Sequence, residues 1–330
     1  MTQDSDVKTF DPKMLLIGLV AGITAALLVF GAGAQPSFAA VLYAASALPI
    51  LLAGLGWGNL CVVIAIATAA AIGAVFVSPS FAVVMTAVTL APAGWISHLA
   101  NLGRPASEIG GPSHLMAWYP LSDIMLQLCA LVAVGVIIVG FMVGYGPHLT
   151  DQLVDLMMEQ MQAQQPELAS SAEVVAQTKR LVVLVLPMTQ GGLWVLLLFS
   201  AYYVATRIVA ASGRGLRPRE DMPSSLRMNR YAIFAFLAGL AACFVGGLPA
   251  LIGATVVGTF GAGFLISGFA VLHFRTRGKP WRMPALILAY LASTMLLPAF
   301  LIVVLGLADT RRAISLTPGR NPQSSNSTET

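Results

Sequence analysis

The side chains best suited to chemistry are gathered in one polar segment that separates two long apolar runs. The segment begins His98-Leu99-Ala100-Asn101-Leu102-Gly103-Arg104-Pro105 and ends Ala117-Trp118-Tyr119-Pro120-Leu121-Ser122-Asp123. An acidic side chain at membrane depth is costly, so it usually faces a bundle interior or water. Asp123 and Gln127 lie one helical turn apart and share a helix face. We expect a polar site or gate formed by His98, Asn101, Arg104, Asp123 and Gln127.

A second interpretation of this segment stays open. Trp118 and Tyr119 are the residue types that anchor an interfacial loop at the membrane–water boundary, and such a loop needs no site. Asp123 either pairs with Arg104 or lies in the headgroup layer.

Gln190 is another candidate site residue because it is polar within an apolar run. It follows Pro187 and precedes Gly191-Gly192, a pattern that predicts a break in the helix. Broken helices at membrane depth are tolerated where they line a cavity. We therefore include Gln190 in the candidate polar site.

Metal, cofactor and catalytic signatures are not found. The histidines show no H-E-x-x-H or i,i+4 pairing, and Cys61, Cys129 and Cys243 lie singly in apolar runs. Met157, Met158 and Met161 recur as a helix face would, which favours packing over a Cu(I) site. No phosphate-binding loop or nucleophile elbow is present. We predict no metal, no cofactor and no enzymatic activity.

The composition excludes a soluble domain. Hydrophobic residues make up 57% of the 330 residues and charged residues 10%, against about 25% charged in ordinary soluble domains. Lipid is therefore the expected solvent for most of the chain. The net charge of +4 is explained by cytoplasmic loops, and no basic helix with interleaved aromatic residues suggests nucleic acid.

About nine apolar stretches are long enough to cross a bilayer, which needs about 20 residues. The stretches are Met14–Ala34, Phe38–Leu55, Leu60–Val77, Phe81–Leu99, Leu121–Gly146, Leu181–Ala205, Tyr231–Gly247, Ala250–Leu272 and Met283–Leu307. Short breaks make the first four two antiparallel hairpins. We predict an all-α, polytopic transmembrane helical bundle over residues 14–308, with nine spans or, as an alternative, eight.

The distribution of basic residues predicts the orientation. With a cytoplasmic N-terminal tail at residues 1–13, the inside connections hold 13 of the 18 lysines and arginines. We expect the protein to lie in the inner (plasma) membrane. Nine spans would put Arg311 and Arg312 outside, against the rule, so either the last stretch does not fully cross or the count differs by one.

Two polar segments complete the chain. Residues 147–180 are predicted as an external amphipathic segment, because Leu149, Leu153 and Leu156 recur at helical spacing. The S-x-x-E form from Ser170 to Glu173 predicts a helix start. Residues 309–330 are expected to be a polar, disordered tail.

Small residues recur on the first span. Gly18, Gly22 and Ala26 form one face, with Ala21 and Ala25 beside it, and Ala254, Gly258 and Ala262 form another face further along the chain. Such spacing lets helix backbones approach closely. It serves either internal packing or the docking of a partner membrane subunit.

The sequence resembles the YybS-like family of predicted bacterial membrane proteins (domain of unknown function family 2232). The resemblance rests on Leu90–Ala100, on Arg104-Pro105, on Ala117-Trp118-Tyr119-Pro120-Leu121, and on Gly306-Leu307-Ala308-Asp309. It covers roughly Met14 to Arg312.

This family is distantly similar to the substrate-binding subunits of energy-coupling-factor transporters. The similarity implies a bundle that binds a micronutrient and docks on a shared scaffold through small residues of its first helix. Ala21 and Ala25 match that pair, so the implied docking face is Gly18, Ala21, Gly22 and Ala25. About nine stretches instead of six keep any binding residues from being transferred.

The leading hypothesis is a substrate-binding subunit for small-solute transport, whose partner subunits would hydrolyse ATP. One alternative is a membrane assembly or scaffold factor without a solute cavity. A less favoured one is a membrane-embedded lipid enzyme in which His98, Arg104 and Asp123 converge.

Overall fold

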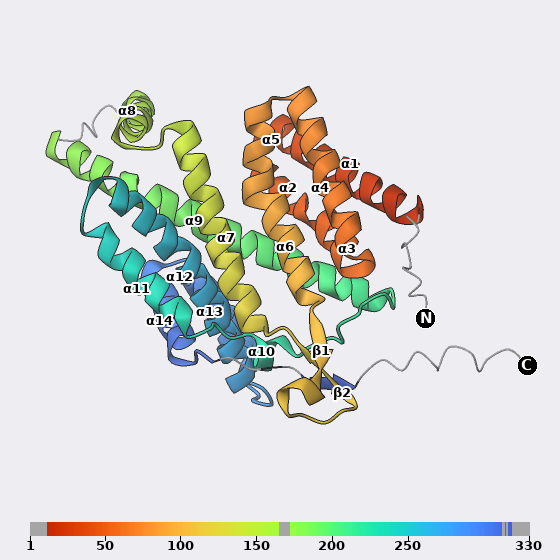
Figure 1. Cartoon of the computed structure of the whole chain (residues 1–330). Coiled ribbons are helices and arrows are strands. Elements are labelled where there is room, and N and C mark those ends of the chain that lie inside the picture. Colours follow the sequence, from red (N-terminus) through yellow and green to blue (C-terminus); the bar gives the residue numbers. More distant parts are fainter. Residues whose placement is uncertain (1–11, 165–171, 312–313, 315, 319–330) are drawn as a thin grey trace, which may run out of the picture. The chain divides into compact units, whose positions relative to one another are not determined.

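The computed structural model describes residues 12–164, 172–311, 314 and 316–318. The fold is helical with one small sheet, which confirms the expected all-α polytopic class (Figure 1). The chain divides into two compact units, which are described separately below. Unit 1 comprises Met1–His98 with Leu197–Leu216, and unit 2 comprises Leu99–Leu196 with Arg217–Thr330.

Unit 1 is built from helices joined by short turns. Its elements are α1 (Pro12–Ala34), η1 (Pro36–Phe38), α2 (Ala39–Ala45), α3 (Ala47–Trp57), α4 (Asn59–Phe76), α5 (Pro79–Met85), the π-helical turn η2 (Thr86–Leu90) and α6 (Ala91–Ala100), which ends two residues into unit 2. The second part of α9 (Ala172–Ala211) also belongs to this unit.

Helix α1 packs along α4 through the small residues that the sequence singled out. A Cβ at Gly18 would meet Ile64 and Cys61, and one at Gly22 would meet Ala65 and Thr68. Ala25 is fully buried and Ala21 nearly so. The expected docking face of Gly18, Ala21, Gly22 and Ala25 is therefore covered from within the chain, because glycine and alanine allow α1 and α4 to approach closely.

Unit 2 holds the remaining elements. They are β1 (Gly103–Pro105), η3 (Ala106–Ile109), β2 (Leu115–Trp118), α7 (Leu121–Val143), α8 (Pro147–Gln164), the first part of α9, α10 (Met222–Ser225), α11 (Tyr231–Cys243), α12 (Gly247–Arg275), α13 (Arg282–Ala292), α14 (Leu296–Ala308) and β3 (Leu316–Pro318).

Helix α12 is the hub of unit 2, and four of its glycines lie five residues apart. A side chain at Gly253 would strike α11, at Gly258 the backbone of Met188 on α9, at Gly263 Cys129 on α7, and at Gly268 the backbone of Ile302 on α14. Five residues turn a helix by about 140°. Successive glycines therefore point in different directions, and each admits a different neighbouring helix.

Helices α11 and α14 accompany α12 over only part of its length. Gly239 of α11 lies against Gly253, and Gly306 of α14 lies against the backbone of Phe264. Because Gly268 meets Ile302 while Phe264 meets Gly306, α14 runs antiparallel to α12. Its C-terminal end thus lies near the middle of α12.

The number of full spans is lower than the expected nine. Within the described residues, seven helices are long and apolar enough to cross a membrane, or eight if α13 and α14 count as one. Helix α11 has only 13 residues. Helices α13 and α14 meet at 117°, where Pro298 lacks the N–H that would bond to Thr294 in a continuous helix. Hydropathy alone did not reveal either interruption.

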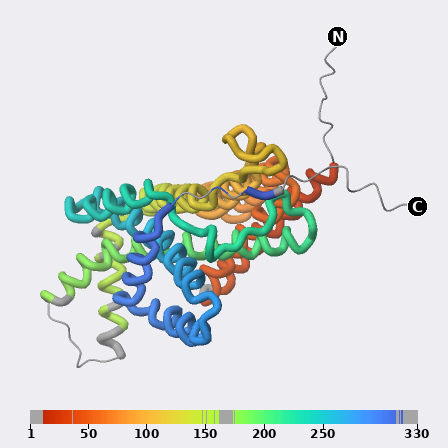
Figure 2. The backbone as a smooth tube through the Cα atoms, turned by 90° about the horizontal axis from the view of Figure 1, so that it is seen from below, coloured from red at the N-terminus to blue at the C-terminus, as the bar shows by residue number. Residues whose placement is uncertain are grey.

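A three-stranded antiparallel sheet in the order β1-β2-β3 closes one end of unit 2. Met116 of β2 pairs with Pro105 on one side and Thr317 on the other, so the C-terminal segment returns beside the start of α7 (Figure 2). The segment after α14 thus pairs with β2 just before α7, which agrees with the alternative that the last apolar stretch does not fully cross. Arg312, like residues 319–330, lies outside the described residues, and β3 corrects the expectation of an entirely disordered tail.

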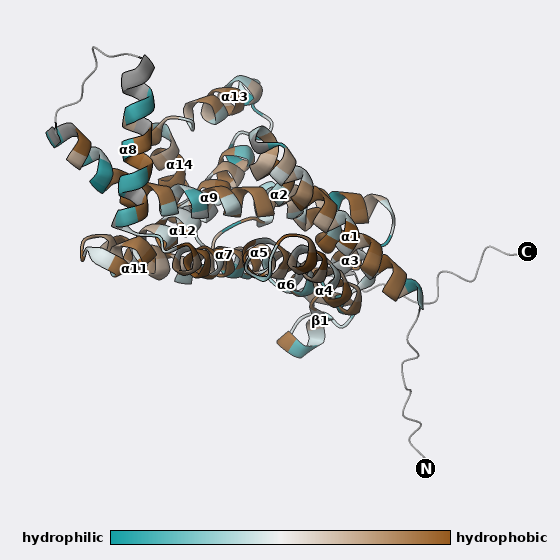
Figure 3. Cartoon of the chain, turned by 90° about the horizontal axis from the view of Figure 1, so that it is seen from above, coloured by the Kyte–Doolittle hydropathy of each residue, from teal (hydrophilic) through white to brown (hydrophobic). Residues whose placement is uncertain are grey.

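Helix α8 is the most hydrophilic of the long helices (Figure 3). The helix confirms the prediction made from the spacing of Leu149, Leu153 and Leu156. Lys179 of α9 lies 2.8 Å from Asp155 and 3.7 Å from Asp151, so ion pairs fasten α8 to α9. Helix α9 begins at Ala172. Ser170 of the predicted capping box and Met161 fall outside the residues whose side chains are described.

Candidate functional site

His98 belongs to unit 1, where it links two helices. It lies near the C-terminal end of α6, and its Nδ1 is 2.8 Å from Nδ2 and 3.1 Å from Oδ1 of Asn59 at the start of α4. The indole of Trp95 contacts the same imidazole at 5.6 Å between ring centroids. The other expected site residues belong to unit 2.

Asn101 and Arg104 occupy the connection that enters unit 2. Asn101 is half-buried in the turn before β1, and Arg104 is exposed on β1. Arg104 lines an open cavity of about 340 Å³ together with Trp118, Tyr119 and Ile314. The indole of Trp118 donates a hydrogen bond of 2.7 Å to Thr317 Oγ1 and thereby fixes the sheet. This region fits the interfacial-loop interpretation as well as a binding site.

Asp123 and Gln127 share a face of α7 but have different partners. The carboxylate of Asp123 is buried and accepts a hydrogen bond from the side-chain amide of Asn229. Gln127 donates to the hydroxyl of Tyr119 at 2.7 Å. The start of α7 is thus tied to the segment before α11 and to the end of β2.

One ion pair that the sequence did not single out joins a buried arginine to a partly exposed aspartate. Arg227 is only 1% exposed, and its Nε donates to Asp309 Oδ2 at 2.7 Å. Its Nη1 donates to the carbonyls of Pro223 and Leu226. Among the described residues, Nη2 has no hydrogen-bond partner. The G-L-x-D pattern in the sequence contains Asp309. No sequence pattern distinguishes Arg227 from the other arginines of the connection before α11.

The residues around Arg227 form irregular backbone within the bundle. Leu226, Arg227, Met228 and Asn229 are all buried and non-helical. The end of the Met228 side chain reaches Gly263 of α12, while the Arg227 guanidinium lies 5.9 Å from the ring of Phe274 near the end of the same helix. Buried irregular backbone requires internal hydrogen-bond partners, and Met228 supplies its carbonyl to the backbone N–H of Arg311 at 3.1 Å.

We call Asp123, Arg217, Arg227, Asn229 and Asp309 the polar end of unit 2. Arg217 donates to the Tyr119 carbonyl at 2.9 Å and forms an ion pair with Glu220, whose side chain is 8% exposed. The polar end therefore joins the sheet, the connection before α11 and the end of α14. Arg217 and Arg227 are paired with carboxylates, and the Asp123 carboxylate accepts from the Asn229 amide, so these groups hold three connections together.

A more exposed ion pair lies beside it. Arg277 Nη2 is 2.8 Å from both carboxylate oxygens of Asp221. Chiefly this guanidinium, with help from Ser224, holds the pKa of Asp221 below its ordinary value. Within the described residues, no group of three or more His, Cys, Asp or Glu side chains could hold a metal ion.

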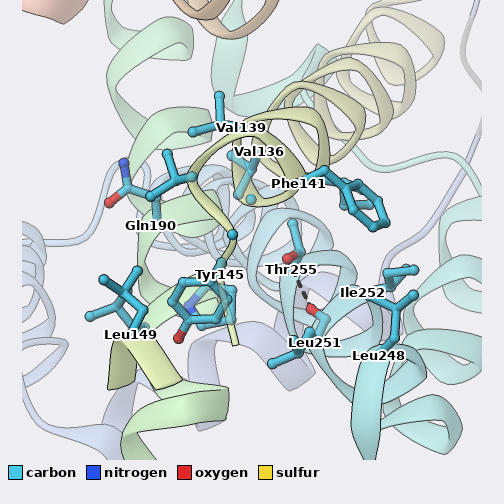
Figure 4. A pocket seen from close by; sticks show the side chains of 16 residues that line it. Val136, Val139, Phe141, Tyr145, Leu149, Gln190, Leu248, Leu251, Ile252 and Thr255 are labelled. Carbon is cyan, nitrogen blue, oxygen red and sulfur yellow. Dashed lines mark hydrogen bonds between the residues drawn. The ribbon is translucent and has the colours of Figure 1, made fainter. Parts of the chain in front are cut away.

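Gln190 lies in a separate, mostly apolar pocket of about 280 Å³ in unit 2 (Figure 4). The pocket is bounded by the C-terminal end of α7, the start of α8, the middle of α9 and the N-terminal end of α12. Tyr145 and Thr255 add hydroxyls to an otherwise aliphatic and aromatic lining, whose labelled members are Val136, Val139, Phe141, Leu149, Leu248, Leu251 and Ile252.

The predicted break at Pro187 is wrong, because α9 continues through it. Proline leaves the carbonyl four residues earlier without its helical donor, and that carbonyl belongs to Val183. The hydroxyl of Tyr145 donates to it at 2.9 Å. Gly191 and Gly192 do not open the helix either, since they form the crossing with Thr255 and Gly258 of α12. Gln190 nevertheless lines a cavity.

The fold and the buried polar end define a polytopic helical membrane protein whose bundle contains an irregular, ion-paired segment. The chain belongs to the DUF2232 family of predicted membrane proteins, whose model matches residues 22–310. No curated protein matches the chain, and no solved structure matches it.

Proposed function

We propose that this membrane protein binds a small, largely apolar solute in the pocket around Gln190, as the substrate-binding part of a transport system. The pocket of about 280 Å³ carries this proposal. Its volume lies just below the range of about 300–1,000 Å³ for small-molecule sites, and an apolar lining with few polar groups is typical of them.

The polar groups of the pocket restrict the ligand. Thr255 donates to Leu251 at 3.0 Å and Tyr145 to Val183 at 2.9 Å, so both hydroxyls already have acceptors. The exposed amide of Gln190 offers both a donor and an acceptor to a bound molecule. A compact hydrocarbon body with one neutral polar group fits this lining, whereas a multiply charged solute does not.

Energy for transport would come from partner subunits, since the sequence has no phosphate-binding loop. The distant resemblance to energy-coupling-factor subunits, which rests on the sequence alone, would imply such an arrangement. Ala21 and Ala25 are buried within unit 1, so docking through this pair would require α1 to separate from its neighbouring helices. A partner would more readily use exposed apolar residues of α1 such as Leu16, Val20 and Leu27.

Filling the pocket tests the proposal. We expect the purified protein to retain small molecules that mass spectrometry detects after organic extraction, and the Ile252→Trp variant to retain at least tenfold less. Leu237→Trp, at an exposed position of α11, is the matched control and should retain the same molecules. Equal retention by all three proteins would remove the pocket as the site.

The scaffold and enzyme alternatives make different predictions. A scaffold factor predicts that Ile252→Trp leaves its role intact. A lipid enzyme requires Arg104 and Asp123 to act on one substrate, yet Arg104 is exposed on β1 and Asp123 is buried against Asn229. These surroundings favour the binding function.

A further inference from the structure

The corner between α12 and α13 carries a concentration of positive charge. Arg275, Arg277, Lys279 and Arg282 follow one another closely, and the sequence contains no Asp or Glu between Asp221 and Asp309. Asp221 neutralises Arg277. Arg275 and Lys279 are exposed, and Arg282 is half-buried. Within the described residues none of these three forms an ion pair, so the corner is an unbalanced cationic patch.

Helix α13 extends this patch with an amphipathic surface. Leu286 is buried, whereas Met283, Leu288 and Leu291 are 63%, 68% and 66% exposed. Tyr290 holds α13 on α12, because its ring stacks on Phe269 at 4.3 Å and its hydroxyl lies 3.0 Å from His273 Nε2. The helix therefore presents an apolar face outward.

The direction of α13 differs from that of the neighbouring spans. The chain bends by 117° between α13 and α14, and α14 runs antiparallel to α12, so α13 is not aligned with these two helices. The exposed indole of Trp281 precedes it. A tryptophan beside basic residues at the start of an apolar helix is typical of elements that lie in the membrane interface.

We propose that Arg275, Lys279 and Arg282, with Trp281 and α13, bind the headgroups of anionic phospholipids. The phosphodiester supplies negative charge that the patch lacks, and the exposed apolar face of α13 meets the acyl chains below it. Arg282 is half-buried and forms no ion pair among the described residues, so its charge is available to a phosphate that reaches the exposed part of the side chain. Asp221 remains bound to Arg277 in this arrangement.

The test uses the full chain in bilayer discs of phosphatidylcholine with a minority of phosphatidylglycerol. Native mass spectrometry then measures the ratio of the two lipids retained on the protein. The wild type should enrich phosphatidylglycerol, and Arg275→Gln/Lys279→Gln/Arg282→Gln should lose this preference by about fivefold for each charge removed. Arg207→Gln removes an exposed charge elsewhere and should keep the preference.

Two further arms make the outcome decisive. Arg275→Lys/Arg282→Lys preserves the charge and should retain most of the enrichment. Lys279→Gln alone changes an exposed loop residue, so its loss of about fivefold remains measurable if the triple variant does not fold. An unchanged lipid ratio in the triple variant would overturn the proposal. Displacement of phosphatidylglycerol by an equal amount of inorganic phosphate would also overturn it, by showing a free-anion site.

Discussion

Tyr145 satisfies the one carbonyl of α9 that Pro187 leaves without a helical donor. The bond to Val183 spans 38 residues and joins the end of α7 to the middle of α9. Proline in a membrane helix is tolerated when neighbouring groups bond to the freed carbonyl. At this position a single hydroxyl takes over the role of the missing N–H, and the helix stays continuous.

Tyr145→Phe should destabilise the protein by about 1 kcal/mol, because it removes that hydrogen bond and leaves the carbonyl without its donor. Pro187→Ala restores the helical donor. In the Pro187→Ala background we therefore expect the effect of Tyr145→Phe on the free energy of unfolding to fall by at least half. Denaturant titration in detergent measures the four proteins. An equal cost in both backgrounds would contradict this account.

The Arg227–Asp309 pair behaves as one unit because Arg227 is buried. Asp309→Asn should cost about 3–5 kcal/mol, since it leaves an uncompensated charge inside the bundle. Arg227→Met/Asp309→Leu removes both charges. It should lower the free energy of unfolding less than Arg227→Met or Asp309→Leu alone. Asp221→Asn, in the exposed pair with Arg277, is the matched control, and exposed pairs contribute little. If the double variant were the least stable, the pair would owe its contribution to something other than charge balance.

The sequence identified polar residues but not their partners. Asp123, Gln127 and Gln190 were recognised because a polar side chain in an apolar run is conspicuous. Asn229, 106 residues from Asp123, was missed because it follows a run of arginines and looks like part of a loop. Arg227 was missed for the same reason. Pairing depends on tertiary contacts, which periodicity and composition do not contain.

At the scale of the element, α12 shows how glycine spacing determines packing. Small residues four apart give a helix one close face, and the sequence revealed such a face at Ala254, Gly258 and Ala262. The interval of five was not recognised, although it distributes close contacts around the whole helix. The hub position of α12 was therefore not predicted, whereas its length and location were.

Gly258→Ala should lower the free energy of unfolding by about 1–3 kcal/mol, because the added methyl would collide with the backbone of Met188. Gly261→Ala is the matched control on the same helix. There the nearest atom, on the Phe236 ring, lies at an ordinary contact distance of 3.6 Å, so alanine should be neutral or slightly stabilising. Thermal unfolding in detergent distinguishes the two. Equal melting temperatures would show that α9 and α12 do not cross at Gly258.

At the scale of the molecule, hydropathy predicted the helical membrane class and most span boundaries. It overestimated the number of crossings because an apolar run looks the same whether it spans, stops halfway or bends. The interruptions depend on Pro298 and on the irregular backbone around Arg227. The bias of basic residues had already indicated an inconsistency at Arg311, and the return of β3 to the start of α7 removes it.

This topology predicts the side on which the C-terminus lies. In a cysteine-free background, Lys279→Cys and a cysteine added after Thr330 should react with an impermeant maleimide from the same side of the membrane. Gln152→Cys, on α8 at the other end of α7, should react from the opposite side. Labelling of Lys279→Cys and the terminal cysteine from different sides would mean that α13 and α14 together cross the bilayer.

The small sheet has a consequence for biosynthesis. Strand β2 is translated before α7–α14, whereas its outer partner β3 follows all of these helices in the chain. Until then the edge of β2 is open and the Trp118 indole lacks Thr317. Proteolytic removal of residues 316–318 would again leave β2 without this partner strand and Trp118 without Thr317. Without β3, one edge of β2 has no strand partner, and an open strand edge can pair with other chains.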